Sequence, residues 1–275
     1  MTRIAVISDI HANYEAIKAV AEDIKKQNVD KVICLGDIVG KGINAHKAVE
    51  IVREISDVCI MGNLEERTCA NPEDFKDDKI EFSRITYNKT LVTEDDIEFM
   101  KNLPQCYEMW LSGNFVRFFH SNPNSYFVPI HPYETDFKEK FKMFEGGRYT
   151  ISDKLADMVV CGHFHFQYME KIFNRTIVNV GSVGSPGCLI SDEKYNAEPR
   201  EIVQAHYAIL EGEIDSKEKG NIGVTFRSVD YDVEKELKSG EFNPEFEGYA
   251  NELRFAKYRY IDKEKEKLEK MGYKF

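Results

Sequence analysis

The chain has 275 residues, of which 42% are hydrophobic and 31% are charged, a composition typical of a soluble globular protein of one or two domains. Its formal net charge of -11 excludes bulk binding of nucleic-acid backbones, because that binding needs a surplus of Lys and Arg. No apolar run reaches the roughly 18 residues that cross a bilayer, and the first run leads into Asp9 and His11 instead of a cleavage site. We therefore expect a cytoplasmic protein with no membrane partner.

Residues 1–62 alternate between apolar, β-branched runs and helical patterns. The apolar runs are RIAVIS, KVICLG and VCIMG, and the helical periods extend from Ala16 to Ile24 and from Ala45 to Val52. Strand, helix, strand, helix, strand is the signature of a parallel α/β sheet. The fold class is therefore expected to be α/β.

The middle of the chain is expected to contain both helices and strands. A capping box formed by Thr93 and Asp96 marks the start of one of these helices. In chain order, the expected elements are a polar segment at 65–80, a helix at 79–91, a helix from Thr93, strands at 105–111 and 114–119, and helical stretches across 131–156.

Strands return in the runs ADMVVCG, FQYMEKIF and TIVNVGS, and the last 30 residues form the pattern of an amphipathic helix with a charged, solvated face. We expect one domain over residues 1–275, with a core at about 1–232 and a C-terminal helical extension at about 233–275. No repeat or long linker divides the chain.

The six cysteines form no CxxC pair, and three of them lie inside apolar runs. This pattern favours reduced core residues over disulfides or a zinc knuckle. The cysteines are Cys34, Cys59, Cys69, Cys106, Cys161 and Cys188.

The segment VVCGHFHF places two histidines one residue apart. In an extended segment His163 and His165 would share a face and Phe164 would oppose them. Such a pair by itself is more typical of surface or packed histidines than of a metal site.

Five apolar runs each end on residues that can bind a metal. The carboxyl ends of strands in an open α/β sheet meet at one edge, so we expect these side chains to converge. Four imidazoles, two carboxylates and one amide oxygen exceed one tetrahedral site, but they suit two ions that share a carboxylate. Two ions about 3.5 to 4 Å apart would clamp a phosphoryl group and generate a hydroxide nucleophile. The residues are Asp9, His11, Asp37, Asn63, His120, His163 and His165.

Each of these residues also has an ordinary structural interpretation. Asp37 follows a glycine and is typical of a turn, Asn63 is typical of a left-handed turn, and His120 is typical of a capped core histidine. Their joint occurrence at five consecutive run ends favours the metal centre.

The motifs SDIH at 8–11, GDIVG at 36–40, GNLEE at 62–66, His120 and GHFH at 162–165 resemble the ordered motifs of the calcineurin-like metallophosphoesterases. The resemblance implies a sandwich of two mixed β-sheets flanked by helices. It also implies two divalent ions, with manganese or iron favoured and zinc, cobalt or nickel also compatible. One ion would be held by Asp9, His11 and His165, the other by Asn63, His120 and His163, with Asp37 as the bridge and Asp37, Asn63 and His120 as catalytic residues.

A narrower resemblance covers the stretches NVGSVGSP, HYAILEGEI and RSVDYDVEKEL. They resemble the small bacterial phosphodiesterase branch of the family, which includes asymmetric diadenosine tetraphosphate hydrolases of Gram-positive bacteria. This resemblance implies a hydrolase that acts on phosphodiester or phosphoanhydride bonds of a small phosphorylated substrate, a nucleotide.

The residue after the motif asparagine is Leu64, where many relatives carry a histidine that can protonate the leaving group. Leucine cannot donate a proton, so good leaving groups, as in phosphodiesters and phosphoanhydrides, are favoured over phosphoserine. Glu65 could supply a carboxyl group instead, although an acidic pair with Glu66 at a helix N-terminus is the more ordinary interpretation.

The remaining candidates for contact with substrate oxygens are the loop at 181–187 and a few polar side chains. His46, His131 and His206 fit no motif and are interpreted as structural or exposed. The candidate contacts, with Leu64 and Glu65, are Asn13, Arg67, Arg84 and Arg148.

Other functions remain open at this stage. They are a general phosphodiesterase or phosphatase of small nucleotides, and a metal-poor scaffold of the same fold that works by protein contacts. A metallo-β-lactamase-like hydrolase is disfavoured because Phe166 and Gln167 follow His165, where an HxHxDH run would continue. A homo-oligomer is compatible with the sequence.

Overall fold

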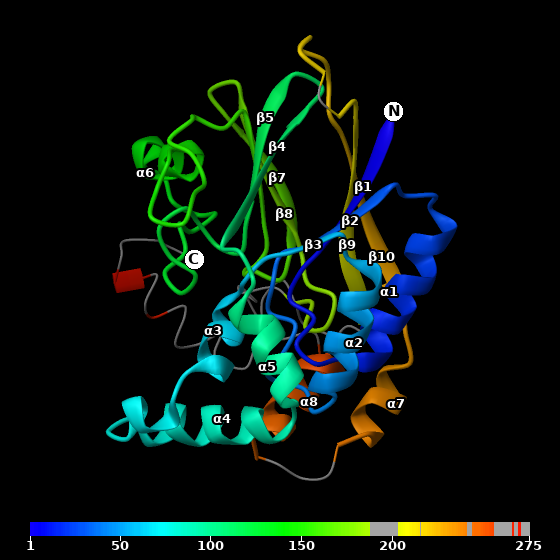
Figure 1. Cartoon of the computed structure of the whole chain (residues 1–275), viewed down its shortest axis with the longest axis vertical. Helices are drawn as coiled ribbons and strands as arrows, with labels where there is room; N and C mark the ends of the chain where they lie inside the picture. The colour runs from blue at the N-terminus through cyan, green and yellow to red at the C-terminus, as the bar shows by residue number, and fades with distance from the viewer. Residues whose placement is uncertain (188–202, 215, 241–243, 256–265, 267–268, 271–275) are drawn as a thin grey trace.

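The computed structural model describes residues 1–187, 203–214, 216–240, 244–255, 266 and 269–270. Within them, two five-stranded β-sheets pack face to face, and helices cover the outer face of the first sheet (Figure 1). The expected sandwich of two mixed sheets is thereby confirmed. No helix in these ranges is both long and apolar enough to span a membrane.

The first sheet has the order β10-β9-β1-β2-β3. Its three N-terminal strands are parallel, and β9 and β10 continue the sheet in antiparallel fashion. The strands are β1 Thr2–Ile7, β2 Lys31–Cys34, β3 Val58–Cys59, β9 Gln204–Gly212 and β10 Gly223–Asp230.

The second sheet has the order β4-β5-β6-β8-β7. Strands β5, β6 and β8 are parallel, so their carboxyl ends reach the same edge, while β4 and β7 are antiparallel edge strands. The strands are β4 Cys106–Leu111, β5 Asn114–Phe119, β6 Met158–Cys161, β7 Gln167–Ile172 and β8 Arg175–Val180.

The helices connect or flank these strands. The helix predicted at 79–91 and the capping box of Thr93 with Asp96 are both confirmed. The helices are α1 Tyr14–Lys26, α2 Ala45–Ile55, α3 Asn63–Cys69, η1 Pro72–Phe75, α4 Lys79–Thr90, α5 Glu94–Lys101, α6 Phe137–Phe141, η2 Lys142–Phe144, α7 Val233–Lys238 and α8 Pro244–Phe255.

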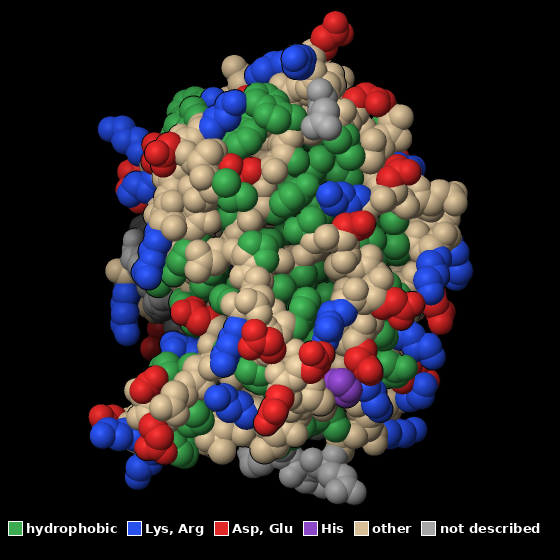
Figure 2. All heavy atoms as spheres, in the orientation of Figure 1, with side chains coloured by type: hydrophobic (Ala, Val, Ile, Leu, Met, Phe, Trp, Pro, Cys, Tyr) green, Lys and Arg blue, Asp and Glu red, His purple; other side chains and the backbone are tan. Residues whose placement is uncertain are grey.

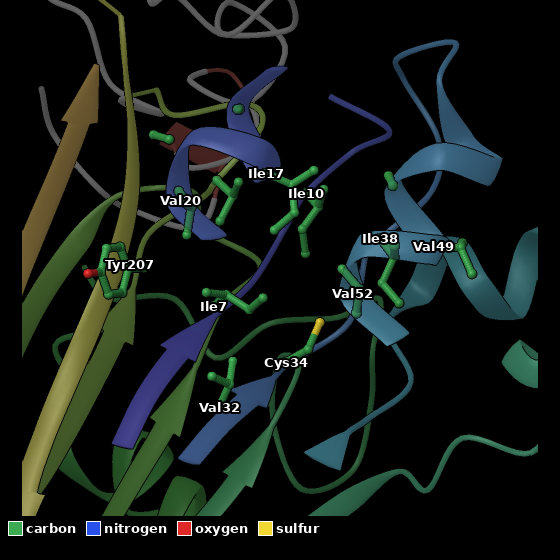
Figure 3. Packing of buried hydrophobic residues seen from close by; sticks show 14 of the residues in the cluster. Ile7, Ile10, Ile17, Val20, Val32, Cys34, Ile38, Val49, Val52 and Tyr207 are labelled. Atoms are coloured by element: carbon green, nitrogen blue, oxygen red, sulfur yellow. The ribbon is translucent and has the colours of Figure 1, made fainter. Parts of the chain in front are cut away.

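Alternation along β1 supplies both faces of the first sheet. Ile4 and Val6 point into the apolar layer between the sheets, whereas Ala5 and Ile7 face α1 and α2. Figure 3 shows the outer layer, where Ile7 and Cys34 lie among aliphatic side chains of the two helices. Because both faces of these strands are buried, their run ends are held firmly in place.

The surface contrasts with this core. On the face shown in Figure 2, acidic and basic side chains are interspersed, and histidine is almost absent. The candidate ligands His11 and His120 are 1% and 0% exposed, so the predicted site lies inside the protein. The described cysteines are free thiols, as predicted, while Cys188 lies outside the described residues.

The helical stretches predicted across 131–156 are mostly wrong. This region contains only α6 and η2, and the rest forms turns and bends. The buried guanidinium of Arg117 donates hydrogen bonds to the carbonyls of Phe144, Glu145, Ser152 and Lys154. Those carbonyls are therefore used by a side chain from β5 instead of by a helical ladder.

The C-terminal helix predicted for the last 30 residues begins at Pro244, and α8 is described as far as Phe255. Most of its remainder lies outside the described residues. The part that is described is not fully solvated, because Tyr249, Ala250 and Leu253 are buried in an apolar cluster with Leu237.

Candidate metal centre

The seven predicted ligands lie at the carboxyl edge of the two sheets. Asp9 and His11 follow β1, Asp37 follows β2, and Asn63 opens α3 after β3. The other three follow the second sheet: His120 comes after β5, and His163 and His165 come after β6. The structure thus brings together side chains that are up to 156 residues apart in sequence (Asp9 to His165).

The backbone of this edge is strained. Five of the seven residues, including both members of the HxH pair, have a positive φ, which is uncommon for residues other than glycine. The sequence alone suggested that this pair is extended. The pair is not extended, because each histidine has a left-handed backbone conformation. The φ angles are 55° at Asp9, 52° at His11, 52° at Asp37, 70° at His163 and 64° at His165.

Hydrogen bonds between the loops hold these conformations. The His11 N–H donates to the Asp37 carbonyl at 2.9 Å, and the His163 N–H donates to Asp9 Oδ2 at 2.9 Å. A Cβ atom on Gly162 would collide with Ser8 Oγ and Asp9 Oδ2. Glycine at the start of GHFH is thus required by close packing against the first loop.

The ligand atoms form two clusters. In the first, His11 Nε2 lies 2.9 Å from His165 Nε2 and 3.7 Å from Asp9 Oδ1, and His165 Nε2 lies 3.2 Å from Asp9 Oδ1. In the second, Asn63 Oδ1 lies 3.0 Å from His120 Nε2 and 3.1 Å from His163 Nδ1. His120 Nε2 is also 3.5 Å from Asp37 Oδ2.

The clusters meet at the two aspartates. Ligand atoms of Asp9, Asp37 and His120 all lie within 4.8 Å of one another, as do those of Asp9, His11 and His165. A carboxylate at this junction can contact ions in both clusters.

Hydrogen bonds behind the imidazoles decide which ring nitrogens face the centre. His120 Nδ1 lies 2.9 Å from the Leu35 carbonyl and His165 Nδ1 lies 2.8 Å from the Ser185 carbonyl, so these nitrogens carry the protons. In the neutral rings Nε2 then presents a lone pair to other acceptors. Asp9 Oδ1, buried beside them, has no hydrogen-bond partner among the described residues.

Acceptors that face one another without a proton between them repel, unless a cation lies among them. Nitrogen and oxygen ligands lie about 2.0–2.2 Å from a transition metal, so neighbouring ligand atoms are about 2.8–3.6 Å apart in octahedral or tetrahedral geometry. The distances in both clusters fall in or next to this range. The donor set therefore fits metal ions.

The electrostatics of the edge point the same way. Burial raises the pKa of Asp37 to about 8, with the charges of Glu65 and Asp9 adding to the effect against His120. Burial lowers the pKa of His163 to about 3 and that of His11 well below its usual range. The neutral forms of His163 and His11 are thus favoured, as metal ligands must be, and burial favours the protonated form of Asp37.

Asp9 behaves differently from Asp37. Burial alone would raise its pKa, but the imidazoles of His165, His120 and His11 lower that pKa well below its usual range. The pKa of His120 is raised by Asp37, Asp9 and Glu65 in spite of burial. Asp9 is thus the carboxylate that stays ionised between the two clusters.

The side chain of Glu65 is buried beneath the metal centre and binds the backbone of the loops that carry the ligands. Its carboxylate is fully buried and accepts hydrogen bonds from the backbone N–H groups of Asp37, Ile38, Val39 and Gly62 at 2.7, 2.7, 3.2 and 2.9 Å. The prediction that it contacts substrate is replaced by a positioning role, which the helix N-terminal interpretation had partly anticipated.

Asn13 is also used within the protein. It caps α1 through the Ala16 N–H, and its amide donates to the Gly184 carbonyl at 3.0 Å and to the hydroxyls of Tyr231 and Tyr249. It is fully buried, which leaves it no surface for substrate.

The other predicted contacts lie nearer the surface. Leu64 packs partly buried against Gly40, and its N–H donates to Asp37 Oδ1 at 2.8 Å. The guanidinium of Arg67 lies between the rings of Phe75 and Phe127. Arg84 pairs with Glu81, and Arg148 is exposed beside the ring of Tyr149.

The C-terminal helix makes a contact with the site that the sequence did not indicate. Lys41 Nζ donates to Ser185 Oγ and to Glu252 Oε2, both at 3.0 Å, and Tyr249 donates to the Gly184 carbonyl at 2.6 Å. Because the Ser185 carbonyl orients His165, α8 supports a ligand of the first cluster. Glu252 gave no signal, since it lies in a mixed polar and apolar segment of a helix that was expected to be solvated.

The part of the chain that contains the candidate ligands matches a family of known proteins. The family model described as the Calcineurin-like phosphoesterase superfamily domain matches residues 2–211. The chain belongs to this family. Membership of a phosphoesterase family supports a hydrolase.

Relatives of this chain include an uncharacterized protein of Methanocaldococcus jannaschii, 27% identical over 232 residues, which are 84% of this chain and 89% of that protein. A metallophosphoesterase from Sphaerobacter thermophilus has a TM-score of 0.64 at 21% identity, covering 93% of this chain and 100% of the other. A protein from Pyrococcus horikoshii OT3 has a TM-score of 0.70 at 17% identity, covering 93% and 99%. These structures share the fold.

Proposed function

We propose that this phosphoesterase hydrolyses phosphodiester or phosphoanhydride bonds of a small nucleotide at a dinuclear metal centre. The observation that carries the proposal is the pair of clusters in which nitrogen and oxygen atoms of ligand-type side chains face one another at 2.9–3.7 Å. Asp9, His11 and His165 would hold one ion, and Asn63, His120 and His163 the other.

Asp37 is the bridging residue in this proposal. When bound, two divalent ions supply Lewis-acid charge at the phosphoryl oxygens and a water of lowered pKa. The protein keeps Asp37 oriented by the N–H of Leu64 at Oδ1, while the Glu65 carboxylate fixes the turn that carries it. His120 stays in one tautomer because its Nδ1–H donates to the Leu35 carbonyl.

Leu64 decides the class of substrate. Neither Leu64 nor Glu65 can protonate a leaving group, because leucine has no acidic proton and the Glu65 oxygens face four backbone donors. Substrates whose leaving groups depart as stable anions are therefore favoured. Diadenosine tetraphosphate meets this requirement and is the specific substrate we propose, with other small nucleotide esters as the alternative.

The metal is expected to be manganese or iron, and the mixed nitrogen and oxygen donors also admit zinc, cobalt or nickel. The test is a metal-by-substrate screen of the full chain with bis-p-nitrophenyl phosphate, p-nitrophenyl phosphate, diadenosine tetraphosphate and a phosphoserine peptide. We expect the diester and the dinucleotide to be hydrolysed fastest. Preferential hydrolysis of the phosphoserine peptide would contradict the argument from Leu64.

Elemental analysis separates the enzyme from a metal-poor scaffold of the same fold. After expression with added metal, we expect close to two ions per chain, falling in Asp37→Asn but not in Asp95→Asn, a surface control in an ion pair with Arg53. Less than one ion per chain would support the scaffold.

A further inference from the structure

A groove lies at the opposite end of the second sheet from the metal centre. It has a volume of about 860 Å³, which is the size of a small-molecule site. It is formed by α6, η2 and the turn between β7 and β8. Its lining residues are Phe137, Lys138, Phe141, Lys142, Glu145, Asp157, Phe173, Asn174, Arg175 and Lys219.

The parallel strands separate this groove from the candidate ligands. Asp157 precedes β6, whose other end leads to His163, and Arg175 opens β8, whose other end leads to Ser185. Six residues of extended strand span about 17 Å. In Figure 1, α6 lies beside one end of the second sheet and α3 beside the other.

Aromatic rings form one wall of the groove. Phe173 is 69% exposed and Phe137 is 57% exposed, and their ring centroids lie 6.1 Å apart. Phe141 lies at the same distance from Phe173. Two large apolar side chains thus remain in water beside an open cavity, an arrangement typical of a binding surface.

The backbone conformation of Phe173 is unusual for a phenylalanine. Its φ is +50°, in the turn between β7 and β8, where glycine or asparagine is the ordinary residue and a bulky side chain is strained. The turn therefore carries a phenylalanine against its backbone preference, and strain of this kind gathers at functional sites.

Basic side chains also line the groove. Four of the lining residues are Lys or Arg and two are acidic, in a chain whose formal net charge is -11. Asp157 Oδ1 forms ion pairs with both Lys219 Nζ at 3.2 Å and the guanidinium of Arg175 at 3.5 Å. Asp157 Oδ2 accepts a hydrogen bond from the Phe115 N–H. Lys142 pairs with Glu139. The groove therefore has positive charge in excess of its carboxylates.

We propose that this groove is a second ligand site, which binds a planar aromatic anion of the nucleoside monophosphate class. The ring packs against Phe137 and Phe173, and the anionic group lies among Lys138, Lys142 and Lys219. Stacking on aromatic rings and charge–charge attraction to lysines act together on such a ligand. The site binds its ligand reversibly and without chemistry, and it does not depend on what the metal centre hydrolyses.

Calorimetric titration of the full, metal-loaded chain with AMP, adenosine and inorganic phosphate tests the proposal. We expect an AMP site in the groove, distinct from any nucleotide binding at the metal centre. At this site adenosine and phosphate should each bind at least tenfold more weakly than AMP. Phe173→Asn should lower the affinity for AMP at least tenfold. Ile151→Asn, at a surface position that is 70% exposed and outside the groove, should not change this affinity. Lys138→Gln combined with Lys219→Gln should lower the affinity for AMP and leave the affinity for adenosine unchanged.

Two further readouts separate the site from a folding defect and from the metal centre. Asparagine suits a positive φ, so Phe173→Asn should keep or raise the melting temperature while it loses AMP. Hydrolysis of bis-p-nitrophenyl phosphate should be the same in both proteins.

Several results would overturn the proposal. One is AMP binding that is equally tight in Phe173→Asn, which would place the nucleotide at the metal centre. Others are the absence of saturable AMP binding, or a loss in Phe173→Asn of self-association or of binding to phosphatidylserine vesicles in place of AMP.

Discussion

The two ends of the parallel strands in the second sheet are built in opposite ways. At the carboxyl end, buried polar atoms such as Asp9 Oδ1 and His165 Nε2 face one another in strained turns without proton donors between them. At the amino end, the exposed Phe173 has a positive φ and lines the groove together with aromatic and basic side chains. One end is suited to small cations inside the protein, the other to an anion at its surface.

The two sites are also built from different parts of the chain. The carboxyl edge is assembled from loops spread over residues 9–165, and it depends on both sheets being in register. The groove uses α6, η2 and a single hairpin turn, together with residues at the start of β6 and before β10. Damage to the sandwich should therefore affect the metal centre first.

The largest effect is expected from removing the bridge or a ligand of the second cluster. Asp37→Asn or His163→Ala should lower kcat/KM by about 10³-fold or more, equal to about 4 kcal/mol of transition-state stabilisation. The fold should survive in Asp37→Asn, because this substitution removes a buried carboxyl whose pKa is raised to about 8. Steady-state kinetics and circular dichroism measure both, with Asp95→Asn as the control. Near-normal rates would remove the two-metal assignment.

Metal removal should abolish turnover, and metal binding should release a proton. Without metal, the carboxyl of Asp37 is protonated below its pKa of about 8, and binding requires its ionised form. Affinity should therefore rise with pH towards 8, and activity should fade as the pH falls, because Asp37 and His120, whose pKa is also raised, take up protons.

Titration of metal at pH 7 in buffers of different ionisation enthalpy counts the released protons. The count should fall in Asp37→Asn. Full activity after exhaustive chelation, or no proton release at pH 7, would contradict the role of Asp37.

A smaller effect is expected at the C-terminal helix. Glu252→Gln leaves the ammonium of Lys41 without its nearly buried carboxylate partner, which should lower the free energy of unfolding by roughly 3 kcal/mol. Because Ser185 orients His165, metal affinity should also fall by about tenfold. Chemical denaturation and metal titration measure the two effects.

The double variant Lys41→Met with Glu252→Leu provides the control, because it removes both charges and should recover part of the stability. Unchanged metal affinity in Glu252→Gln would show that α8 does not support the centre.

The smallest effect is expected from Leu64→His, which introduces a proton donor beside Asn63. Poor leaving groups should gain more than good ones, so the dependence of kcat/KM on leaving-group basicity in a series of aryl phosphodiesters should become flatter. Diadenosine tetraphosphate should gain little. An equal gain for all esters would mean that another residue already supplies the proton.

Local patterns predicted that the candidate ligands meet, because each one follows an apolar run. Strand ends of a parallel sheet share an edge, so Asp9 and Asp37 as neighbours followed from the pattern. His120 follows a strand of the other sheet, so only the motif resemblance placed it beside them. The same reasoning could not show that His163 and His165 have positive φ, because that conformation comes from the hydrogen bond between His163 and Asp9.

Long-range contacts account for the differences elsewhere. The region at 131–156 has helical patterns, but Arg117 takes up its carbonyls from a distant strand. Asn13 and Glu65 looked available to substrate because their partners are Gly184, Tyr249 and the turn after β2, which no spacing reveals.

The sequence by itself determined the α/β class, the two sheets implied by the family motifs and the set of candidate metal-ligating side chains, because these depend on hydrophobic period and residue chemistry. Tertiary structure alone decided which polar groups remain for function. A side chain such as Glu65 serves the fold when distant backbone donors surround it. A side chain such as Asp9 is left for a cation because no donor from the described part of the chain reaches its inner oxygen.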